Sequence, residues 1–394
     1  MKKDLLLVLI LINVIVAKPA FSQWQKCIGL ERQYISSLIV KGNNIFAGTE
    51  NGIFISTNNG DNWSETAPLY NWIFSLTCNE NSIFSGTELE LFHSTNNGNN
   101  WTRTGWNYYI GVSALSINGN SIIAGTSGIG ICISTNNGSN WVFGNFPLDY
   151  VYTLTSNMYF SFAGNNDGVY RSTDKGFVWT LTGLNIPTIS LVSNGSNIYA
   201  GTDHSGVYFS SNNGTSWFPT ALDTGVVTSL EINGSILVAG FDHGGIYLSS
   251  DNGMNWAQKN QGFDTLPTIY SLKIFNNYIY AGTYGNSLWC RPLSEMIGIQ
   301  NISMEVPAAF SLSQNYPNPF NPSTTIKFSI PKSSAIKLTI FDITGRELEV
   351  LVNETLAAGT YQTEWNASSY SSGIYFYKLQ SGNYSETKRM ILVK

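Results

Sequence analysis

The chain has 394 residues, with 20 Lys or Arg and 25 Asp or Glu, so its formal net charge at pH 7 is −5. Such sparse, slightly acidic charge argues against a nucleic-acid partner, because phosphate backbones are bound mainly by clusters of Lys and Arg. The four cysteines, Cys27, Cys78, Cys132 and Cys290, are not spaced as metal pairs and are too few for a disulfide-stapled scaffold. We expect Cys78 and Cys132 to be buried free thiols.

The first 22 residues have the pattern of a secretory signal peptide. Lys2 and Lys3 precede an apolar run over residues 5–17, and residues 20–22, Ala-Phe-Ser, supply a small-x-small cleavage site. The alternative is a membrane anchor, but this run is shorter than the roughly 20 apolar residues that cross a bilayer. We expect an exported, soluble mature chain that begins at Gln23.

Residues 23–294 contain a repeat with a period near 40 residues. The string Ser-Ser/Thr-Asn/Asp-x-Gly-x-x-Trp occurs six times, and its tryptophans are 38, 40, 38, 38 and 39 residues apart. Short runs with apolar alternation, separated by Asn, Gly and Ser, precede each string and predict strands. Four strands in about 39 residues are typical of one blade of an antiparallel β-propeller. The defining positions of the six strings are Ser56, Asn58, Gly60, Trp63; Ser94, Asn96, Gly98, Trp101; Ser134, Asn136, Gly138, Trp141; Ser172, Asp174, Gly176, Trp179; Ser210, Asn212, Gly214, Trp217; and Ser249, Asp251, Gly253, Trp256.

The seventh repeat lacks the string, which predicts how the ring closes. An Ala-Gly or Ser-Gly pair at the end of the second strand occurs seven times, the last at Ala281-Gly282. Residues 24–27 resemble the strand that begins at each string's tryptophan, so we predict seven blades with the last completed by the N-terminal strand. Cys27 and Cys290 would then lie on neighbouring strands, not directly opposite, and a disulfide between them stays an open alternative.

The repeated string resembles the Asp-box, or BNR repeat, of sialidases, sortilin-type receptors and xyloglucanases. We expect it to form the hairpin turn between strands three and four, with the Asn or Asp side chain accepting a hydrogen bond from the backbone two residues on and the tryptophan as a buried anchor. Calcium binding by the clustered Asn and Asp is the alternative, although oxygen ligands for calcium usually carry more charge. We expect no metal and no cofactor.

The loops opposite the box turns are the predicted place for a site, because ligands of ring folds usually bind there. Exposed aromatic residues of the inter-blade loops in the first half of the ring suggest a platform for a glycan or a protein, and core packing of the same rings is the alternative. In the second half, Asp-His pairs and nearby aspartates suggest a metal or acid-base cluster, or simply tight turns. The candidate residues are Tyr34, Tyr70, Trp72, Trp106, Tyr108, Tyr109, Tyr150, Asp203, His204, Asp223, Asp242, His243 and Asp264.

The sequence does not match what sialidases and xyloglucanases, the enzymes with a similar repeat, require for catalysis. Sialidases hold their substrate with three arginines beside a Tyr/Glu pair and an Asp, whereas residues 23–294 contain only Arg32, Arg103, Arg171 and Arg291. Xyloglucanases place paired carboxylates between two propellers, whereas a single propeller is predicted here. We therefore expect a non-catalytic binding or scaffold module, with a secreted glycoside hydrolase or lyase using Asp203, Asp223, Asp242 or Asp264 as the alternative.

A change of composition marks a second domain over residues 310–394, after a linker predicted at 295–309. Alternating strands with Gly and Asn turns predict a small β-sandwich. The run Asn315-Tyr-Pro-Asn-Pro-Phe-Asn-Pro322, the turn Phe341-Asp-Ile-Thr-Gly-Arg346 and the ending Lys388-Arg-Met-Ile-Leu-Val-Lys394 closely resemble the type A C-terminal sorting domain of the type IX secretion system of Bacteroidota. The resemblance implies passage through the periplasm, recognition by the outer-membrane translocon, and release or attachment at the cell surface.

Overall fold

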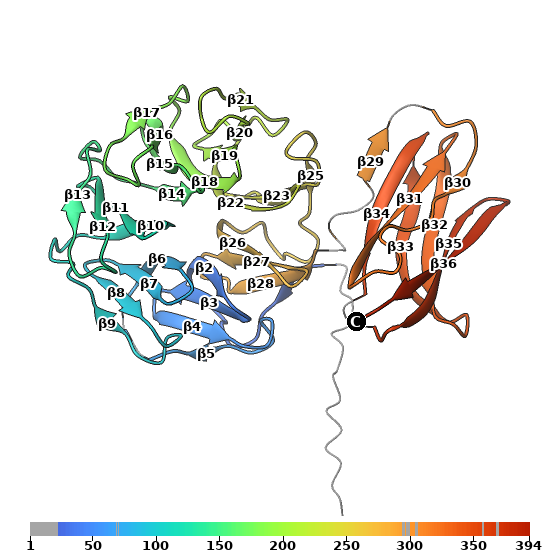
Figure 1. Cartoon of the computed structure of the whole chain (residues 1–394), viewed down its shortest axis with the longest axis horizontal. Coiled ribbons are helices and arrows are strands. Elements are labelled where there is room, and N and C mark those ends of the chain that lie inside the picture. Colours follow the sequence, from blue (N-terminus) through green and yellow to red (C-terminus); the bar gives the residue numbers. More distant parts are fainter. Residues whose placement is uncertain are drawn as a thin grey trace, which may run out of the picture.

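The computed structural model describes residues 23–67, 69, 71–293, 296, 300–303, 306–356, 358–367 and 370–394. Its described elements are strands, which form seven four-stranded antiparallel sheets between Gln25 and Pro292 and two more after Gln300. Figure 1 shows the first seven sheets arranged as a ring, so the predicted all-β propeller is confirmed. Within these residues no helix has the length and apolar character needed to cross a membrane. The predicted signal peptide lies outside the described residues.

Each of the first six sheets uses four strands that are consecutive in the chain. These strands are β2 (Ile35–Lys41), β3 (Asn44–Thr49), β4 (Gly52–Ser56), β5 (Ser64–Glu65); β6 (Ile73–Cys78), β7 (Ile83–Thr87), β8 (Leu91–Ser94), β9 (Thr102–Arg103); β10 (Val112–Asn118), β11 (Ser121–Thr126), β12 (Ile131–Ser134), β13 (Val142–Phe143); β14 (Thr153–Ser156), β15 (Ser161–Asn165), β16 (Gly168–Ser172), β17 (Thr180–Leu181); β18 (Thr188–Asn194), β19 (Asn197–Thr202), β20 (Val207–Ser210), β21 (Phe218–Pro219); and β22 (Val227–Asn233), β23 (Ile236–Phe241), β24 (Gly245–Ser249), β25 (Ala257–Gln258).

The seventh sheet combines the two ends of the repeat region. Strands β26 (Ile269–Phe275), β27 (Tyr278–Thr283) and β28 (Leu288–Pro292) are joined by β1 (Gln25–Lys26), which pairs antiparallel with β28. Trp24, 1% exposed, donates from Nε1 to the Lys259 carbonyl at 2.6 Å and stacks on Phe263 with ring centroids 5.3 Å apart. The N-terminal strand therefore lies within the last sheet of the ring.

The closing strands also place two cysteines. Gln25 lies opposite Cys290, and the Cys27 backbone donates to the Leu288 carbonyl. Cys27 and Cys290 are thus both buried on neighbouring strands but not directly opposite, in the relation that the sequence predicts.

The Ala-Gly pairs are explained by the packing between sheets. A Cβ on Gly125 would lie 2.6 Å from Cγ1 of Val151, the residue that leads into the next inner strand. A Cβ on Gly282 would lie 2.7 Å from Cβ of Ile35, so the last sheet contacts the first in the same way. Since neither position has room for a side chain, glycine lets neighbouring sheets approach closely around the ring.

The C-terminal domain consists of two four-stranded sheets that enclose one apolar core, with Phe328, Leu338 and Tyr377 fully buried. One sheet has the order β29-β34-β31-β30 and the other β33-β32-β35-β36. Part of the predicted linker is strand instead: β29 pairs with β34, so it adds an edge strand to the sandwich. The strands are β29 (Gln300–Ser303), β30 (Ser311–Leu312), β31 (Ser323–Ile330), β32 (Ser334–Phe341), β33 (Glu347–Leu356), β34 (Gly359–Asn366), β35 (Gly373–Ser381) and β36 (Tyr384–Leu392).

Candidate functional site

The six box strings form hairpin turns stabilised by one repeated set of hydrogen bonds. In the second sheet, Ser94 Oγ accepts from the Gly98 N–H at 2.9 Å and donates to Asn96 Oδ1 at 3.0 Å, and that oxygen accepts from the Asn100 N–H at 2.9 Å. The other five boxes make the same three bonds. The Asn or Asp side chain therefore reaches the N–H four residues on, not two as predicted, because serine occupies the nearer groups. Its oxygen is used by the turn itself.

The box turns also explain the residue type at the variable position just before the box glycine. The residue before each box glycine has a positive φ, for example 54° at Asn97, next to 83° at Gly98. Asn tolerates this left-handed conformation better than most residues, and five of the six boxes carry Asn at this position, with Lys175 as the exception. The boxes thus form a structural rim. Among the described residues, no group of three or more His, Cys, Asp or Glu side chains is arranged to hold a metal.

The face opposite the box turns consists of the turns between second and third strands and the connectors between sheets; we call it the mouth face. Backbone hydrogen bonds join the two kinds of loop: the Gly225 N–H donates to the His204 carbonyl at 3.1 Å, and the Asp242 N–H donates to the Val226 carbonyl at 3.1 Å. The Tyr34 N–H likewise donates to Glu50 Oε2 at 2.9 Å. The turns and the connectors therefore lie together on this face.

Five aromatic rings, three from loops of the mouth face and two from the adjoining strands β6 and β26, contact one another and form what we call the mouth cluster: Tyr34, Trp72, Phe74, Tyr270 and Tyr284. The Tyr34 ring lies 5.4 Å from Trp72, 4.9 Å from Tyr270 and 5.3 Å from Tyr284, measured between centroids. Trp72 also contacts Phe74 at 5.7 Å. Trp72 is 42% exposed and Tyr284 is 66% exposed, so the cluster presents aromatic surface to solvent.

The mouth cluster depends on ring closure. Tyr270 and Tyr284 belong to the last sheet, whereas Tyr34 and Trp72 precede the inner strands of the first and second sheets. The platform predicted from the sequence missed Tyr270 and Tyr284 because it was placed only in the first half of the ring. It missed Phe74 because only loop residues were considered, whereas Phe74 lies in β6. A repeat alignment carries a usable signal for one of them: Tyr284 follows Ala-Gly-Thr, the place that Glu50 takes in the first repeat.

The electrostatic surroundings of Tyr34 reflect this crowding. Burial, followed by the neighbouring phenols of Tyr270, Tyr284 and Tyr150 and the carboxylate of Glu50, raises the pKa of Tyr34 well above its usual range. The Tyr34 hydroxyl is therefore a neutral donor at all physiological pH values.

The remaining predicted aromatic residues separate into different environments. Trp106 packs edge-on against Tyr108 and Trp141, and the Tyr108 hydroxyl donates to the Trp141 carbonyl at 3.0 Å, so both rings join the packing beside the third sheet. Tyr109 is 78% exposed, and Tyr150 contacts Tyr152 at 4.8 Å. Tyr70 lies outside the described residues.

The two Asp-His pairs occupy matching turns of the mouth face. His204 and His243 have φ values of 76° and 51°, which fits their place in tight turns. Each histidine Nδ1 contacts the preceding aspartate Oδ1, at 2.5 Å for Asp203 and 2.7 Å for Asp242. Asp223 and Asp264 are exposed in the neighbouring connectors.

Asp242 has the strongest set of contacts among these carboxylates. Its Oδ1 accepts from Thr268 Oγ1 at 2.6 Å, and this bond, with the contribution of His243, holds the pKa of Asp242 below its usual value despite partial burial. A lowered pKa is the opposite of what a general acid needs.

Carboxylates dominate the mouth face. Among its described loop residues the cations are Arg32 and Lys259, and Arg103, the last residue of β9, pairs with Glu90 at 2.9 Å. Its carboxylates are Glu31, Glu50, Glu88, Glu90, Asp149, Asp167, Asp203, Asp223, Asp242 and Asp264. The face that presents the mouth cluster is therefore strongly negative.

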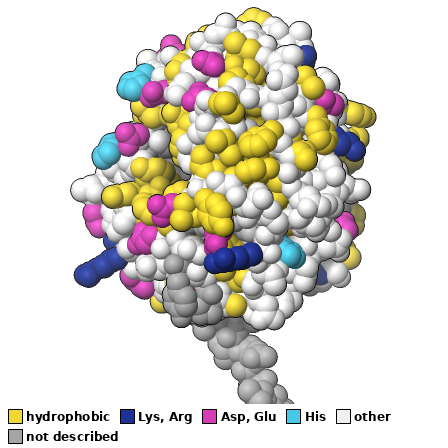
Figure 2. Space-filling model, turned by 90° about the vertical axis from the view of Figure 1, so that its left-hand side faces the viewer, with side chains coloured by type: hydrophobic (Ala, Val, Ile, Leu, Met, Phe, Trp, Pro, Cys, Tyr) yellow, Lys and Arg dark blue, Asp and Glu magenta, His cyan; other side chains and the backbone are white. Residues whose placement is uncertain are grey.

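A second exposed surface lies on the outer edge of the ring. Figure 2 shows hydrophobic side chains gathered on the side of the molecule that is at the left in Figure 1, where β13 lies. Val142 and Phe143 of β13 are 51% and 54% exposed, and the adjoining Asn145 N–H donates to the Phe177 carbonyl of the next box turn. The outer strands of the first two sheets instead carry Ser64, Glu65, Thr102 and Arg103.

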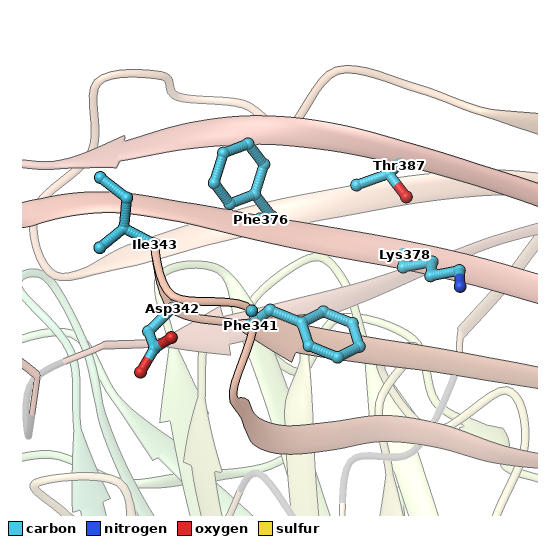
Figure 3. Close-up of a pocket in the computed structure, with 7 residues that line it drawn as sticks. Phe341, Asp342, Ile343, Phe376, Lys378 and Thr387 are labelled. Carbon is cyan, nitrogen blue, oxygen red and sulfur yellow. The ribbon is translucent and has the colours of Figure 1, made fainter.

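The C-terminal domain has a cavity of about 290 Å³ on its β33-β32-β35-β36 sheet. Figure 3 shows Phe341, Ile343 and Phe376 around it, with Lys378 and Thr387 further along the strands. The loop on one side is held together by Asp342, which accepts hydrogen bonds from the backbone and side chains of Thr344 and Arg346. This is the Phe-Asp-Ile-Thr-Gly-Arg turn that the sequence analysis singled out.

Comparison with known families identifies this second domain. Residues 314–394 match the secretion system C-terminal sorting domain. The predicted type IX sorting domain is confirmed, and the chain is an exported protein of the cell surface or extracellular space. No curated protein matches the chain.

Solved structures similar to this chain contain β-propellers of several kinds. YCF48 from Cyanidioschyzon merolae is 13% identical, with 70% of this chain and 100% of that one covered and a TM-score of 0.54. YCF48 bound to D1 peptide is 14% identical, with 70% and 99% covered and a TM-score of 0.55. The Niastella koreensis GH74 enzyme is 16% identical with a TM-score of 0.56; the match covers 67% of this chain but 43% of the enzyme. At sequence identities this low, structural similarity establishes only that the fold is shared.

Proposed function

We propose that this chain is an exported, non-catalytic binding protein whose propeller holds a glycan or protein ligand at the mouth cluster. The exposed rings of Trp72 and Tyr284, supported from behind by Tyr34, are the observation that carries the proposal. Aromatic side chains offer large contact area at low entropic cost, and soluble proteins seldom leave several of them exposed together. The type IX sorting domain is expected to be recognised by the outer-membrane translocon and to deliver this surface outside the cell.

A secreted carbohydrate-active enzyme is the second candidate. It is favoured by carboxylates on the same face as the mouth cluster, Asp203, Asp223, Asp242 and Asp264. Against it, the lowered pKa of Asp242 suits an ionised group and not a general acid. A purely structural spacer is a third option, and it predicts neither binding nor turnover.

A glycan and protein binding screen of the full chain, combined with a turnover assay on the bound glycans, tests the proposal. We expect binding without turnover, with the signal lost in Trp72→Ala and retained in Phe143→Ala, which removes an exposed ring from the outer edge. Hydrolysis of a bound glycan that Asp242→Asn or Asp203→Asn abolishes would replace the proposal with the enzyme. Binding that Trp72→Ala leaves intact would place the site elsewhere.

A further inference from the structure

We infer that the ligand of the mouth cluster is a cationic polypeptide segment, in which Lys or Arg side chains lie over the exposed rings and pair with the surrounding carboxylates. This inference rests on the proposed function and adds the chemical class of the ligand. It follows from two observations that are independent of each other: the exposure of the aromatic rings and the sign of the charge around them.

The rings provide the contact surface. A cation near the face of Trp or Tyr is attracted by the electrons of the ring, an interaction of about 0.5–1 kcal/mol at exposed sites. Trp72 and Tyr284 are exposed, and both contact Tyr34, which packs behind them. No described cation lies over either of these two rings, whereas Lys26 lies 4.9 Å from the centroid of Trp289 elsewhere in the ring. The mouth cluster therefore presents aromatic faces that a ligand can use.

Two carboxylates flank the cluster directly. Glu50 accepts from the Tyr34 N–H through Oε2, and Asp242 accepts from Oγ1 of Thr268, two residues before Tyr270, at 2.6 Å. The described hydrogen bonds to Asp242 end on Oδ1, from Thr268 and His243, so its Oδ2 faces no described donor. An incoming ammonium or guanidinium group would find acceptors beside the rings.

The charge of the whole face favours the same class of ligand. The described loops of the mouth face hold two cations, Arg32 and Lys259, and Arg103 of β9 pairs with Glu90; the other nine carboxylates given above outnumber these cations. The opposite face mixes the two signs more evenly: Lys41 at the end of β2 and Lys175 in a box turn lie among Asp61, Glu80, Asp174 and Asp251. A negative surface around an aromatic centre steers positively charged partners towards it, whereas a neutral glycan gains nothing from the field. We therefore favour a Lys- or Arg-bearing polypeptide over a neutral glycan.

Fluorescence anisotropy with three labelled probes and the full chain tests the inference. The probes are a peptide of alternating Lys and Gly, the same peptide with every lysine acetylated, and a neutral glucan oligosaccharide. We expect the lysine peptide alone to bind, and its affinity to fall at least about fivefold as ionic strength rises from about 0.01 to 0.15 M, where the screening length shrinks from about 30 to 8 Å. We expect Glu50→Gln and Asp242→Asn each to weaken binding about 1.5- to 5-fold, as for exposed ion pairs.

Glu80→Gln, a matched change on the opposite face, is the control and should leave the affinity unchanged. Equal binding of the acetylated and unmodified peptides, or no effect of either mouth variant, would overturn the inference. Salt-independent binding of the glucan that Trp72→Ala abolishes would overturn the cationic ligand and leave the proposed binding function standing. Thermal melts of each variant verify folding, and Trp72, being 42% exposed, can be truncated with little loss of core packing.

Discussion

Removing the Trp24 side chain tests whether the N-terminal strand is what completes the ring. Trp24 is 1% exposed, packs between Phe263 and the closing sheet, and donates to the Lys259 carbonyl at 2.6 Å. A buried indole removes about 150–250 Å² from water, worth about 4–6 kcal/mol at about 25 cal/mol per Å². Since substitution of a buried Trp by Ala commonly costs about 3–5 kcal/mol, we expect Trp24→Ala to lower the free energy of unfolding by about 4 kcal/mol.

The assay is urea denaturation followed by circular dichroism. Lys26→Ala is the matched control in the same strand: Lys26 is exposed and its ammonium lies over Trp289, so its loss should cost at most about 1 kcal/mol. If Trp24→Ala costs less than about 1 kcal/mol, pairing of β1 with β28 contributes little to closure and the reasoning fails. A large loss of stability in Trp24→Ala but not in Lys26→Ala supports the reasoning.

Three further predictions concern the box, the sorting domain and the thiols. Ser94→Ala removes the acceptor of the Gly98 N–H and should cost about 1–3 kcal/mol in urea denaturation, with ligand binding unchanged; altered binding would contradict a structural role. Burial raises the pKa of Glu349 in the folded protein above its ordinary value of 4.5. The protonated side chain therefore contributes fully to stability below pH 4.5, and this contribution is lost as pH rises through the folded-state pKa. Glu349→Gln keeps an acceptor for Trp365 Nε1 and should raise the melting temperature at pH 8 but not at pH 4; equal melting at pH 8 would oppose this. Burial raises the pKa of Cys132 to about 12, so thiol reagents at pH 8 should modify it only after denaturation.

Several features follow from sequence alone because they are local and repeated. The spacing of Trp63, Trp101 and the later box tryptophans predicts one unit of four strands, and the hairpin needs no distant partner for its hydrogen bonds. The sorting domain is equally readable, since its motifs follow one another along residues 310–394. The missing seventh box and the strand-like residues 24–27 also predict the pairing found between β1 and β28.

The composition of the mouth cluster, in contrast, was decided by tertiary structure. Trp72 and Trp106 both lie in connectors before an inner strand, yet Trp72 meets Tyr34 at the surface while Trp106 packs against Trp141. No local sequence pattern distinguishes these two tryptophans, because the direction in which a connector folds over its sheet determines whether its ring is exposed or buried. Tyr270 reaches Tyr34 only because the last sheet packs on the first. The repeat determines the ring by itself, but a site assembled across its closure depends on contacts between residues more than two hundred positions apart.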